Sequence, residues 1–369
     1  MKKRILIFST AYFPLIGGAE VAVKEITDRI PEIEFVMVTA RLNKDFLEKE
    51  KIGNIEVHRI GRGNNWDKFR LIWQGARYAK KLGHFDVVWS IMASYAGFAS
   101  LRFKKRNLTV PFLLTLQEGD SKWDIYKHVW WCWWYFKQIF KKADKIQAIS
   151  NYLAQWAKDL GAKCPIEIVP NGISMEHGTL NMEHVNSEPL KKIITVSRLV
   201  EKNGIEYLIR AIKVLDEEYN LKVALRIFGD GKLREKLEKI VEDFKIKGVE
   251  FAGEIANKEV YDRLKQADVF VRPSLSEGLG NAFLEAMSVN VPVIATPVGG
   301  IPDFLEEGKT GWFCNTKDPK SIAEKIKYIL DEKNKSEVNE VVENAKKMVE
   351  EKYNWDLIAG KMKDIFKFQ

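Results

Sequence analysis

The sequence predicts an α/β protein made of two Rossmann-like, doubly wound domains that face a cleft. Short apolar segments rich in β-branched residues alternate with longer amphipathic segments, which is typical of parallel sheets covered by helices. The alternation pauses after the Pro-, Asn- and Gly-containing stretch 169–174 and then starts again. A chain of 369 residues also exceeds one ordinary hydrophobic core and suits two domains.

The first domain, residues 1–172, is predicted to hold six buried strands with room for crossover helices between them. The N-terminus combines basic residues with a following apolar run, a pattern that a secretion signal also shows. The apolar run is only about seven residues long and leads into a Gly-Gly loop, so we expect a buried strand instead of a signal. The six segments are 4–9, 34–40, 55–60, 86–92, 111–117 and 144–150.

The second domain, residues 190–350, is predicted to follow a linker at 173–189. Its expected strands are 192–197, 222–229, 249–253, 268–274 and 291–296, and its clearest helices are 204–219 and 232–246. The amphipathic stretch at the end of the chain, within 351–369, should pack as a helix. In doubly wound sheets, ligands bind at the carboxyl ends of the strands, so we look for functional residues there.

Composition and charge restrict the class of protein. Hydrophobic residues make up 46% of the chain and charged residues 30%, which excludes a disordered chain. The three cysteines, Cys132, Cys164 and Cys314, are scattered without metal-ligand spacing, which suits a reducing cytoplasm. Residues 1–174 hold 28 Lys or Arg against 17 Asp or Glu, whereas residues 175–369 hold 31 against 34. The first half is therefore expected to face an anionic partner.

The segment "SEGLGNAFLEAM" places Glu277 just after a predicted strand and Glu285 just inside the following helix. A surface glutamate and a helix-capping acid would give the same pattern. A helix beginning near Gly280 would, however, also point free backbone amides at an anion. We expect the amides of Asn281, Ala282 and Phe283 to face a phosphate, with hydroxyl-bearing groups of the ligand beside the two carboxylates.

Other loops at predicted strand ends supply cations and glycines. Arg198 and Lys202, in "VSRLVEKNG", follow the first strand of the second domain and could neutralise a diphosphate. The glycine loops are weak signals when each is taken alone, but they add to this set: Gly229 and Gly231 in "FGDGKL", and Gly17 and Gly18 in "IGGAE".

Together these segments resemble the family 4 retaining glycosyltransferases. The similarity rests on "GGAE", "VPNGIS", "VSRLVEKNG", "RIFGDGKLREKLE", "VEFAGEI", "DVFVRPSLSEGLGNAFLEAMSVNVPVIATPVGG" and "IPDFLEEGKTGWF", in that order along the chain. The resemblance implies the GT-B fold, with an acceptor-binding first domain and a nucleotide-sugar-binding second domain. The closing segment "YNWDLIAGKM" resembles the family's last helix, which crosses back to the first domain.

The resemblance also implies residue roles. Glu277 would contact the hydroxyls of the donor sugar and Glu285 the ribose of the nucleotide, while Arg198 and Lys202 would bind the diphosphate and stabilise its departure. Gly17 and Gly18 would line the cleft beside the diphosphate. The implied reaction retains the configuration of the sugar, because the departing oxygen takes the acceptor's proton on the same face. No D-x-D motif occurs, and we expect neither a metal nor another cofactor.

One position departs from the family pattern. Gln117, in "LLTLQEGD", stands where the family usually has a histidine. A glutamine can still hydrogen-bond a sugar hydroxyl, but it does not titrate near neutral pH. We expect Gln117 to contact the donor sugar or the acceptor, with help from Asp120.

The stretch "HVWWCWWYFKQIFKK", residues 128–142, admits several interpretations. No apolar run in the chain reaches the 18 or more residues of a membrane-spanning helix, but aromatic residues favour membrane interfaces. The segment around Trp130–Phe136 could therefore touch an anionic membrane, pack in the core, line an acceptor groove or stack on sugars. Binding to single-stranded nucleic acid is the least favoured alternative, since no nucleic-acid module is present.

The sequence thus predicts a cytoplasmic transferase, peripheral on the inner face of the cell membrane. Its partners would be a nucleotide-sugar donor and a glycan or lipid-linked acceptor, with no nucleic acid. A nucleotide-sugar epimerase of the same fold and a non-catalytic nucleotide-sugar-binding subunit are the alternatives. The complete set of Arg198, Lys202, Glu277 and Glu285 argues against the second.

Overall fold

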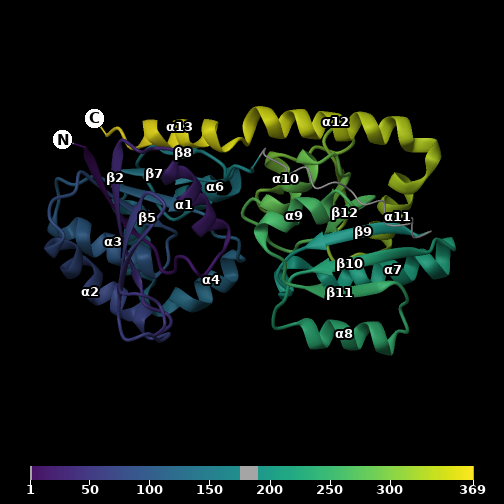
Figure 1. The fold of residues 1–369 in the computed structure, drawn as a ribbon, viewed down its shortest axis with the longest axis horizontal. Coiled ribbons are helices and arrows are strands. Elements are labelled where there is room, and N and C mark those ends of the chain that lie inside the picture. Colours follow the sequence, from purple (N-terminus) through teal and green to yellow (C-terminus); the bar gives the residue numbers. More distant parts are fainter. Residues whose placement is uncertain (1, 175–189, 369) are drawn as a thin grey trace. The chain divides into compact units, whose positions relative to one another are not determined.

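The chain folds as two α/β units, which confirms the predicted fold class of two Rossmann-like domains (Figure 1). The computed structural model describes residues 2–174 and 190–368, except for the side chains of residues 257 and 258. One unit, the N-terminal unit, comprises Met1–Gly172 and Trp355–Gln369, and the other, the C-terminal unit, comprises Ile173–Asn354. Most of the predicted linker, residues 175–189, lies outside the described residues.

The N-terminal unit is built on a sheet with the strand order β3-β4-β2-β1-β5-β6-β7-β8. Among the strand pairs that the structure describes in this sheet, β3–β4 is antiparallel and the others are parallel. The sequence pattern missed β3 and β8, because β3 reads "KEKI" and is a short polar edge strand, and β8 has only three residues. The strands are β1 (Lys3–Phe8), β2 (Ile33–Ala40), β3 (Lys49–Ile52), β4 (Ile55–Ile60), β5 (Val87–Ile91), β6 (Phe112–Leu116), β7 (Lys145–Ala148) and β8 (Ile166–Ile168).

Helices cover both faces of this sheet. On one face α2 packs against α3, and α3 packs against α5; on the other face lie α1 and the last helix of the chain, α13. Alternate side chains of the strands serve the two faces, which explains the continuous apolar runs seen in the sequence. The helices are α1 (Gly18–Asp28), α2 (Asp67–Lys81), α3 (Tyr95–Arg106), α4 (Lys122–Val129), η1 (Trp130–Cys132), α5 (Trp133–Lys142), α6 (Asn151–Asp159) and α13 (Trp355–Ile365).

The last helix belongs to the core of the N-terminal unit, although it is separated from the rest of that unit by the whole C-terminal unit (Figure 1). Met362 and Phe366 are fully buried. The Phe366 ring lies 5.0 Å from that of Trp89 on β5 and 5.9 Å from that of Phe35 on β2, both in edge-on geometry. The end of the chain is therefore a structural part of the first sheet's packing.

Phe366→Ala is expected to lower the free energy of unfolding of the N-terminal unit by about 3–5 kcal/mol, because it leaves a cavity between two aromatic rings. Hydrogen exchange measured by mass spectrometry should show faster exchange in β1, β2 and β5 and little change in the C-terminal unit. The neighbouring exposed Lys367→Ala is the matched control. Equal protection in Phe366→Ala and Lys367→Ala would contradict the prediction.

The C-terminal unit has a fully parallel sheet with the order β11-β10-β9-β12-β13-β14. The strands are β9 (Lys191–Val196), β10 (Val223–Phe228), β11 (Val249–Gly253), β12 (Val269–Arg272), β13 (Val293–Ala295) and β14 (Trp312–Phe313). The helices are η2 (Glu201–Asn203), α7 (Ile205–Tyr219), α8 (Arg234–Asp243), α9 (Asn257–Leu264), α10 (Asn281–Ser288), η3 (Ile301–Asp303), α11 (Pro319–Leu330), η4 (Glu332–Asn334) and α12 (Lys335–Lys352).

Candidate functional site

The predicted donor-binding residues gather at one edge of the C-terminal sheet. The chain runs from β9 outward to β10 on one side and later returns to β12 on the other, so the strand order reverses between β9 and β12. Arg198 and Lys202 follow β9, and Glu277 follows β12. The structure therefore places these three residues at the carboxyl ends of neighbouring strands, where doubly wound sheets bind their ligands.

The two loops that carry these residues are joined through their backbones. The amide of Leu275 donates to the carbonyl of Lys202 over 2.6 Å. Gly204 makes this approach possible: its φ is +67°, and a Cβ there would lie 2.0 Å from the Pro273 carbonyl oxygen. The loop of Lys202 is thus fixed against the loop that leads to Glu277, independently of both side chains.

Glu277 forms a buried ion pair that the sequence analysis did not anticipate. An oxygen of its carboxylate lies 2.6 Å from Nη2 of Arg272, and the two side chains are only 13% and 8% exposed. The Arg272 guanidinium stands 4.3 Å from the centroid of the Phe283 ring and also donates to the Val196 carbonyl over 3.3 Å. In the sequence, the one feature that could have indicated this ion pair is the arginine that ends the otherwise apolar strand "VFVR".

The start of α10 corrects part of the predicted phosphate site. The helix begins at Asn281, as expected, and Gly280 precedes it with a φ of +94°. The Phe283 amide, however, already donates to the Gly280 carbonyl over 3.1 Å, and the Phe283 side chain is buried beneath Arg272. Phe283 is therefore removed from the predicted set of free amides, which leaves Asn281 and Ala282.

Glu285 lies one turn into α10 with its carboxyl group in a desolvated position. Burial raises its pKa to about 7, and the positive charge of Arg272 opposes part of that rise. A single buried guanidinium thus acts on both glutamates, through a direct ion pair with Glu277 and through its field at Glu285. Two carboxyl groups influenced by one fixed cation form an arrangement that can accept hydrogen bonds from sugar hydroxyls.

Glu285→Gln is expected to stabilise the C-terminal unit relative to the unmodified protein by about 1–3 kcal/mol at pH 8, and by much less at pH 5. Burial makes the folded Glu285 bind a proton that the unfolded chain has released. Stability contributed by this residue is therefore lost as the pH rises from near 4.5 to the folded pKa of about 7. Urea unfolding at both pH values measures the difference. A constant difference would contradict the prediction, and Glu340→Gln on an exposed face of α12 is the control.

Arg198, one of the two predicted phosphate-binding cations, lies open to solvent. Among the described residues no carboxylate pairs with its guanidinium. Its backbone carbonyl accepts a hydrogen bond from the Asn203 side chain over 2.7 Å, which holds the turn between Arg198 and Lys202. An exposed guanidinium at the carboxyl end of a central strand is available to an anionic ligand.

Gly229 and Gly231 have a packing role that explains why they are glycines. Their φ angles are +121° and +159°. A Cβ at Gly229 would lie 2.0 Å from the Ser197 carbonyl oxygen, and one at Gly231 would lie 2.6 Å from that of Leu199. The loop after β10 thereby supports the loop that carries Arg198, so these two glycines shape the site from behind it.

Unpartnered polar atoms mark the same edge of the sheet. Among the described residues of the C-terminal unit, the buried side-chain nitrogens and oxygens without a hydrogen bond all lie at the ends of β9 and β12. A buried polar group without a partner costs about 1–3 kcal/mol, so such a cluster indicates a place built for a ligand. The atoms are Oγ1 of Thr195, Oγ of Ser197, Nε of Arg272 and Oγ of Ser274.

The predicted residues of the N-terminal unit lie at the carboxyl edge of its own sheet. Gly18 begins α1 after the β1 loop, and Gly17 precedes it; both are exposed. Gln117 follows β6, is buried, and accepts a hydrogen bond from the Asn171 amide over 3.3 Å. Asp120 is exposed in the same loop. Strand order reverses between β1 and β5, and such an edge is where doubly wound sheets generally bind their ligands.

Glu118, next to Gln117, is a candidate that the sequence analysis overlooked. One of its carboxyl oxygens accepts the Ala93 amide over 2.6 Å, and the other is buried without a partner among the described residues. Burial raises its pKa to about 7, in spite of hydrogen bonds from backbone amides. In the sequence, only its place directly after a buried strand distinguished it from a surface glutamate.

Comparison with known families now identifies the protein's class. Residues 180–366 match the model of "Glycosyl transferases group 1", and residues 16–177 match that of "Glycosyltransferase Family 4". The chain belongs to the group 1 glycosyltransferases. The predicted family and the assignment as a transferase enzyme are therefore confirmed.

Relatives of this glycosyltransferase align with all or part of the chain, with modest sequence identity. An uncharacterized glycosyltransferase of Methanocaldococcus jannaschii is 26% identical over 358 residues, which are 95% of this chain and 94% of the relative. A putative colanic acid biosynthesis glycosyltransferase, WcaL of Escherichia coli, is 30% identical over 236 residues, 60% of this chain and 56% of the relative. The sulfoquinovosyl transferase of Arabidopsis thaliana is 35% identical over 48% of this chain and 34% of its own length.

Solved structures share the fold of this glycosyltransferase. Sucrose-phosphate synthase from Thermosynechococcus elongatus superposes with a TM-score of 0.84 at 18% identity, covering 99% of this chain and 98% of its own. The Anabaena protein HepE, solved in complex with UDP-glucose, gives a TM-score of 0.80 at 15% identity and covers 98% of both chains. At these identities the likeness shows the fold.

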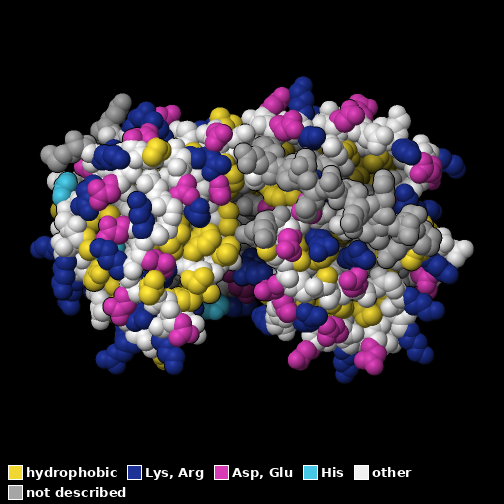
Figure 2. Space-filling model, in the orientation of Figure 1, with side chains coloured by type: hydrophobic (Ala, Val, Ile, Leu, Met, Phe, Trp, Pro, Cys, Tyr) yellow, Lys and Arg dark blue, Asp and Glu magenta, His cyan; other side chains and the backbone are white. Residues whose placement is uncertain are grey.

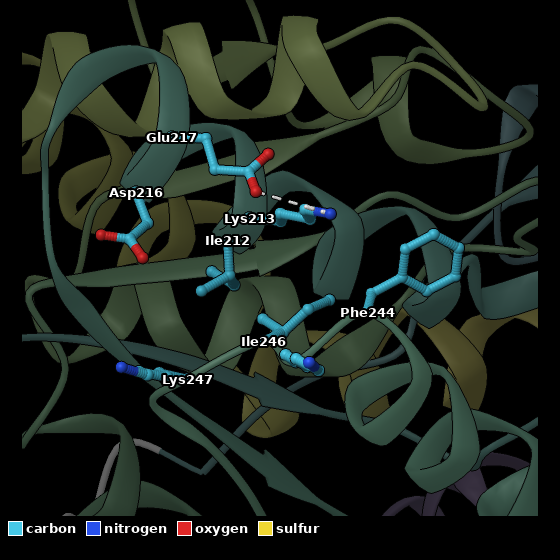
Figure 3. Close-up of a pocket in the computed structure, with 8 residues that line it drawn as sticks. Ile212, Lys213, Asp216, Glu217, Phe244, Ile246 and Lys247 are labelled. Carbon is cyan, nitrogen blue, oxygen red and sulfur yellow. Dashed lines mark ion pairs between the residues drawn. The ribbon is translucent and has the colours of Figure 1, made fainter.

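The glycosyltransferase also has a small surface pocket away from the candidate site (Figure 3). It lies between the second half of α7 and the loop that leads into β11, at the amino ends of the strands. Lys213 and Glu217 form an ion pair of 3.5 Å at its rim, and Phe244 contacts Lys213. Because the donor residues sit at the opposite edge of the sheet, this pocket is not part of their site.

Proposed function

We propose that this glycosyltransferase moves a hexose from a nucleoside-diphosphate sugar to a hydroxyl acceptor, with retention of configuration and without a metal ion. The observation that carries the proposal is the pair of carboxylates, Glu277 and Glu285, placed around the buried cation of Arg272. Arg198 and Lys202 stand at the neighbouring strand end. The arrangement offers acceptors for hydroxyls and separate cations for a diphosphate.

In this proposal Glu277 binds hydroxyls of the donor sugar and Glu285 binds the ribose. The free amides of Asn281 and Ala282 face the phosphates, and Arg198 and Lys202 neutralise the charge that grows on the leaving diphosphate. Gln117 and Asp120 contact the donor sugar or the acceptor from the N-terminal unit. Gly17 and Gly18 allow the backbone to come close to the diphosphate.

The bond from the anomeric carbon to the diphosphate oxygen breaks first, which gives the sugar oxocarbenium character. The departing phosphate oxygen takes the proton of the acceptor hydroxyl, and the acceptor oxygen bonds to the anomeric carbon on the same face. No carboxylate has to act as a nucleophile. The positive charges of Arg198 and Lys202 substitute for a metal ion in stabilising the leaving group.

The acceptor we propose is a growing glycan or a lipid-linked sugar, met at an anionic membrane surface. The name of one relative supports a glycan acceptor, since it refers to colanic acid biosynthesis. Among the described residues no helix combines the length and the apolarity needed to cross a bilayer. Contact would therefore be peripheral.

The test is mass-spectrometric detection of donor consumption by the purified protein. UDP-glucose, UDP-galactose, UDP-N-acetylglucosamine and GDP-mannose are each offered with EDTA present, with and without lipid vesicles. We expect one donor to be hydrolysed slowly or transferred, at a rate that EDTA leaves unchanged. Loss of turnover in EDTA with recovery on added Mg²⁺ would overturn metal independence, and epimerised donor without release of nucleotide would favour an epimerase.

A further inference from the structure

We infer that three adjacent helices of the N-terminal unit, α2, α3 and α5, together with η1, which directly precedes α5, form a binding face for an anionic lipid bilayer. This inference deepens the proposed membrane contact by naming its surface and its lipid chemistry. We call the face the aromatic–cationic face and define it by Trp73, Arg102, Lys105, Arg106, Trp130, Trp131, Trp134 and Tyr135.

The tryptophan-rich stretch divides into a buried and an exposed part. Phe136, Ile139 and Phe140 have no exposed surface and anchor α5 to the sheet. Trp130, Trp131 and Trp134 remain 75%, 68% and 78% exposed. Three large indoles held in water by a well-anchored helix are an apolar surface that the core does not use.

The same surface continues onto α3 and α2 through stacked cations. Lys105 Nζ lies 4.8 Å from the centroid of the Tyr135 ring, which joins α3 to α5. The guanidinium of Arg102, one turn earlier on α3, lies 4.1 Å from the centroid of the Trp73 ring, which joins α3 to α2. Trp73 is itself 60% exposed. Aromatic rings and cations therefore alternate across three helices.

The charge of these helices is of one sign. Residues 68–81 of α2, 95–106 of α3 and 133–142 of α5 contain five, four and three Lys or Arg, and none of these ranges contains an Asp or Glu. Asp67, at the first position of α2, is buried and paired with Arg70. Each cation near an anionic bilayer contributes about 1 kcal/mol of attraction. These three helices thus account for much of the positive excess in the first half of the chain.

A bilayer fits these features better than another occupant. Tryptophan and tyrosine prefer the headgroup level of a membrane, where the ring is apolar and the N–H or O–H stays hydrated. Lys and Arg beside them meet anionic headgroups. Figure 2 shows that hydrophobic side chains also gather elsewhere on the surface of the N-terminal unit. A face of aromatic rings and cations lies on a membrane and does not span it.

The experiment is flotation of the full chain with vesicles, which needs no turnover and so fails or succeeds independently of the proposed transferase reaction. Vesicles of phosphatidylcholine with about 30% phosphatidylglycerol are compared with phosphatidylcholine alone, in about 0.1 M and about 0.5 M salt. We expect binding to the anionic vesicles only, weakened at least tenfold by high salt. Trp131→Ala/Trp134→Ala should weaken it at least tenfold, as should Arg102→Glu/Lys105→Glu.

Controls separate a specific face from general charge. Lys239→Glu/Lys347→Glu makes the same charge change at exposed sites of the C-terminal unit and should bind like the unmodified protein. Brominated lipid should quench tryptophan fluorescence, and Trp131→Ala/Trp134→Ala should lose most of that quenching. The inference is overturned if both face variants, folded by circular dichroism, float as well as the unmodified protein. It is also overturned if the protein ignores vesicles and binds an oligothymidine instead.

Discussion

Lys202→Met should lower kcat for sugar transfer by about 100- to 1,000-fold, because it removes one of the cations proposed to stabilise the departing diphosphate. Methionine keeps the length of the side chain. The backbone carbonyl of Lys202 still receives the Leu275 amide, so the loop around the site keeps its shape. The substitution should therefore lower the rate of the chemical step and change the stability of the fold only weakly.

Steady-state rates with the donor chosen by the panel test this prediction, together with the melting temperature. Lys239→Met, an exposed lysine on α8 of the same unit, is the matched control and should leave kcat unchanged. A Lys202→Met protein with full kcat would show that this lysine does not face the diphosphate. A rise in KM with kcat unchanged would assign this lysine to ground-state binding only.

Arg272→Met should be the most damaging change to the site's electrostatics. It leaves Glu277 buried without its ion-pair partner, which costs about 3–5 kcal/mol. It also removes the positive charge that opposes the raised pKa of Glu285. Both stability and donor use should fall, and the pKa of Glu285 should rise further.

A double-mutant cycle separates the positioning role from general packing. In Arg272→Met/Glu277→Gln the unpaired charge is gone, so much of the lost stability should return while transfer activity stays low. Affinity for the nucleotide sugar chosen by the panel should drop more than affinity for its nucleoside diphosphate alone, because Glu277 is proposed to hold the sugar. Equal losses for the two ligands would mean that Arg272 supports the fold without orienting Glu277.

Much of the fold could be predicted because its strands are buried on both faces. Such strands contain continuous apolar runs, as in β1 and β5, and these runs predict a buried strand without any knowledge of the neighbouring strands. Edge strands carry no such signal: β3 is polar and β14 has two residues. Their existence depends on pairing with a neighbour, which a local pattern does not contain.

For the candidate site, the sequence located the loops but not their partners. The spacing of Glu277 and Glu285 indicated a ligand. The cation that acts on both glutamates is Arg272, which the sequence shows only as one residue of a predicted strand. The sequence did not reveal Glu118 either. Its carboxylate is held by the amide of Ala93, which follows β5, and a local pattern around Glu118 does not contain that contact. The local sequence also did not predict which tryptophans are buried. Helical periodicity places Phe136 and Trp134 on different faces of the helix, but it does not say which face packs against the sheet.

The position of α13 has a consequence for synthesis of the chain. Ile173 and Asn354 pair as a bridge, so the polypeptide leaves the N-terminal unit and comes back at adjacent points, with the C-terminal unit inserted between them. On the ribosome, the first 172 residues emerge long before the helix that completes their core. Their apolar groove stays uncovered until residues 355–366 have also been synthesised. The nascent chain should consequently depend on chaperones over this interval, and a chain truncated before Trp355 should aggregate.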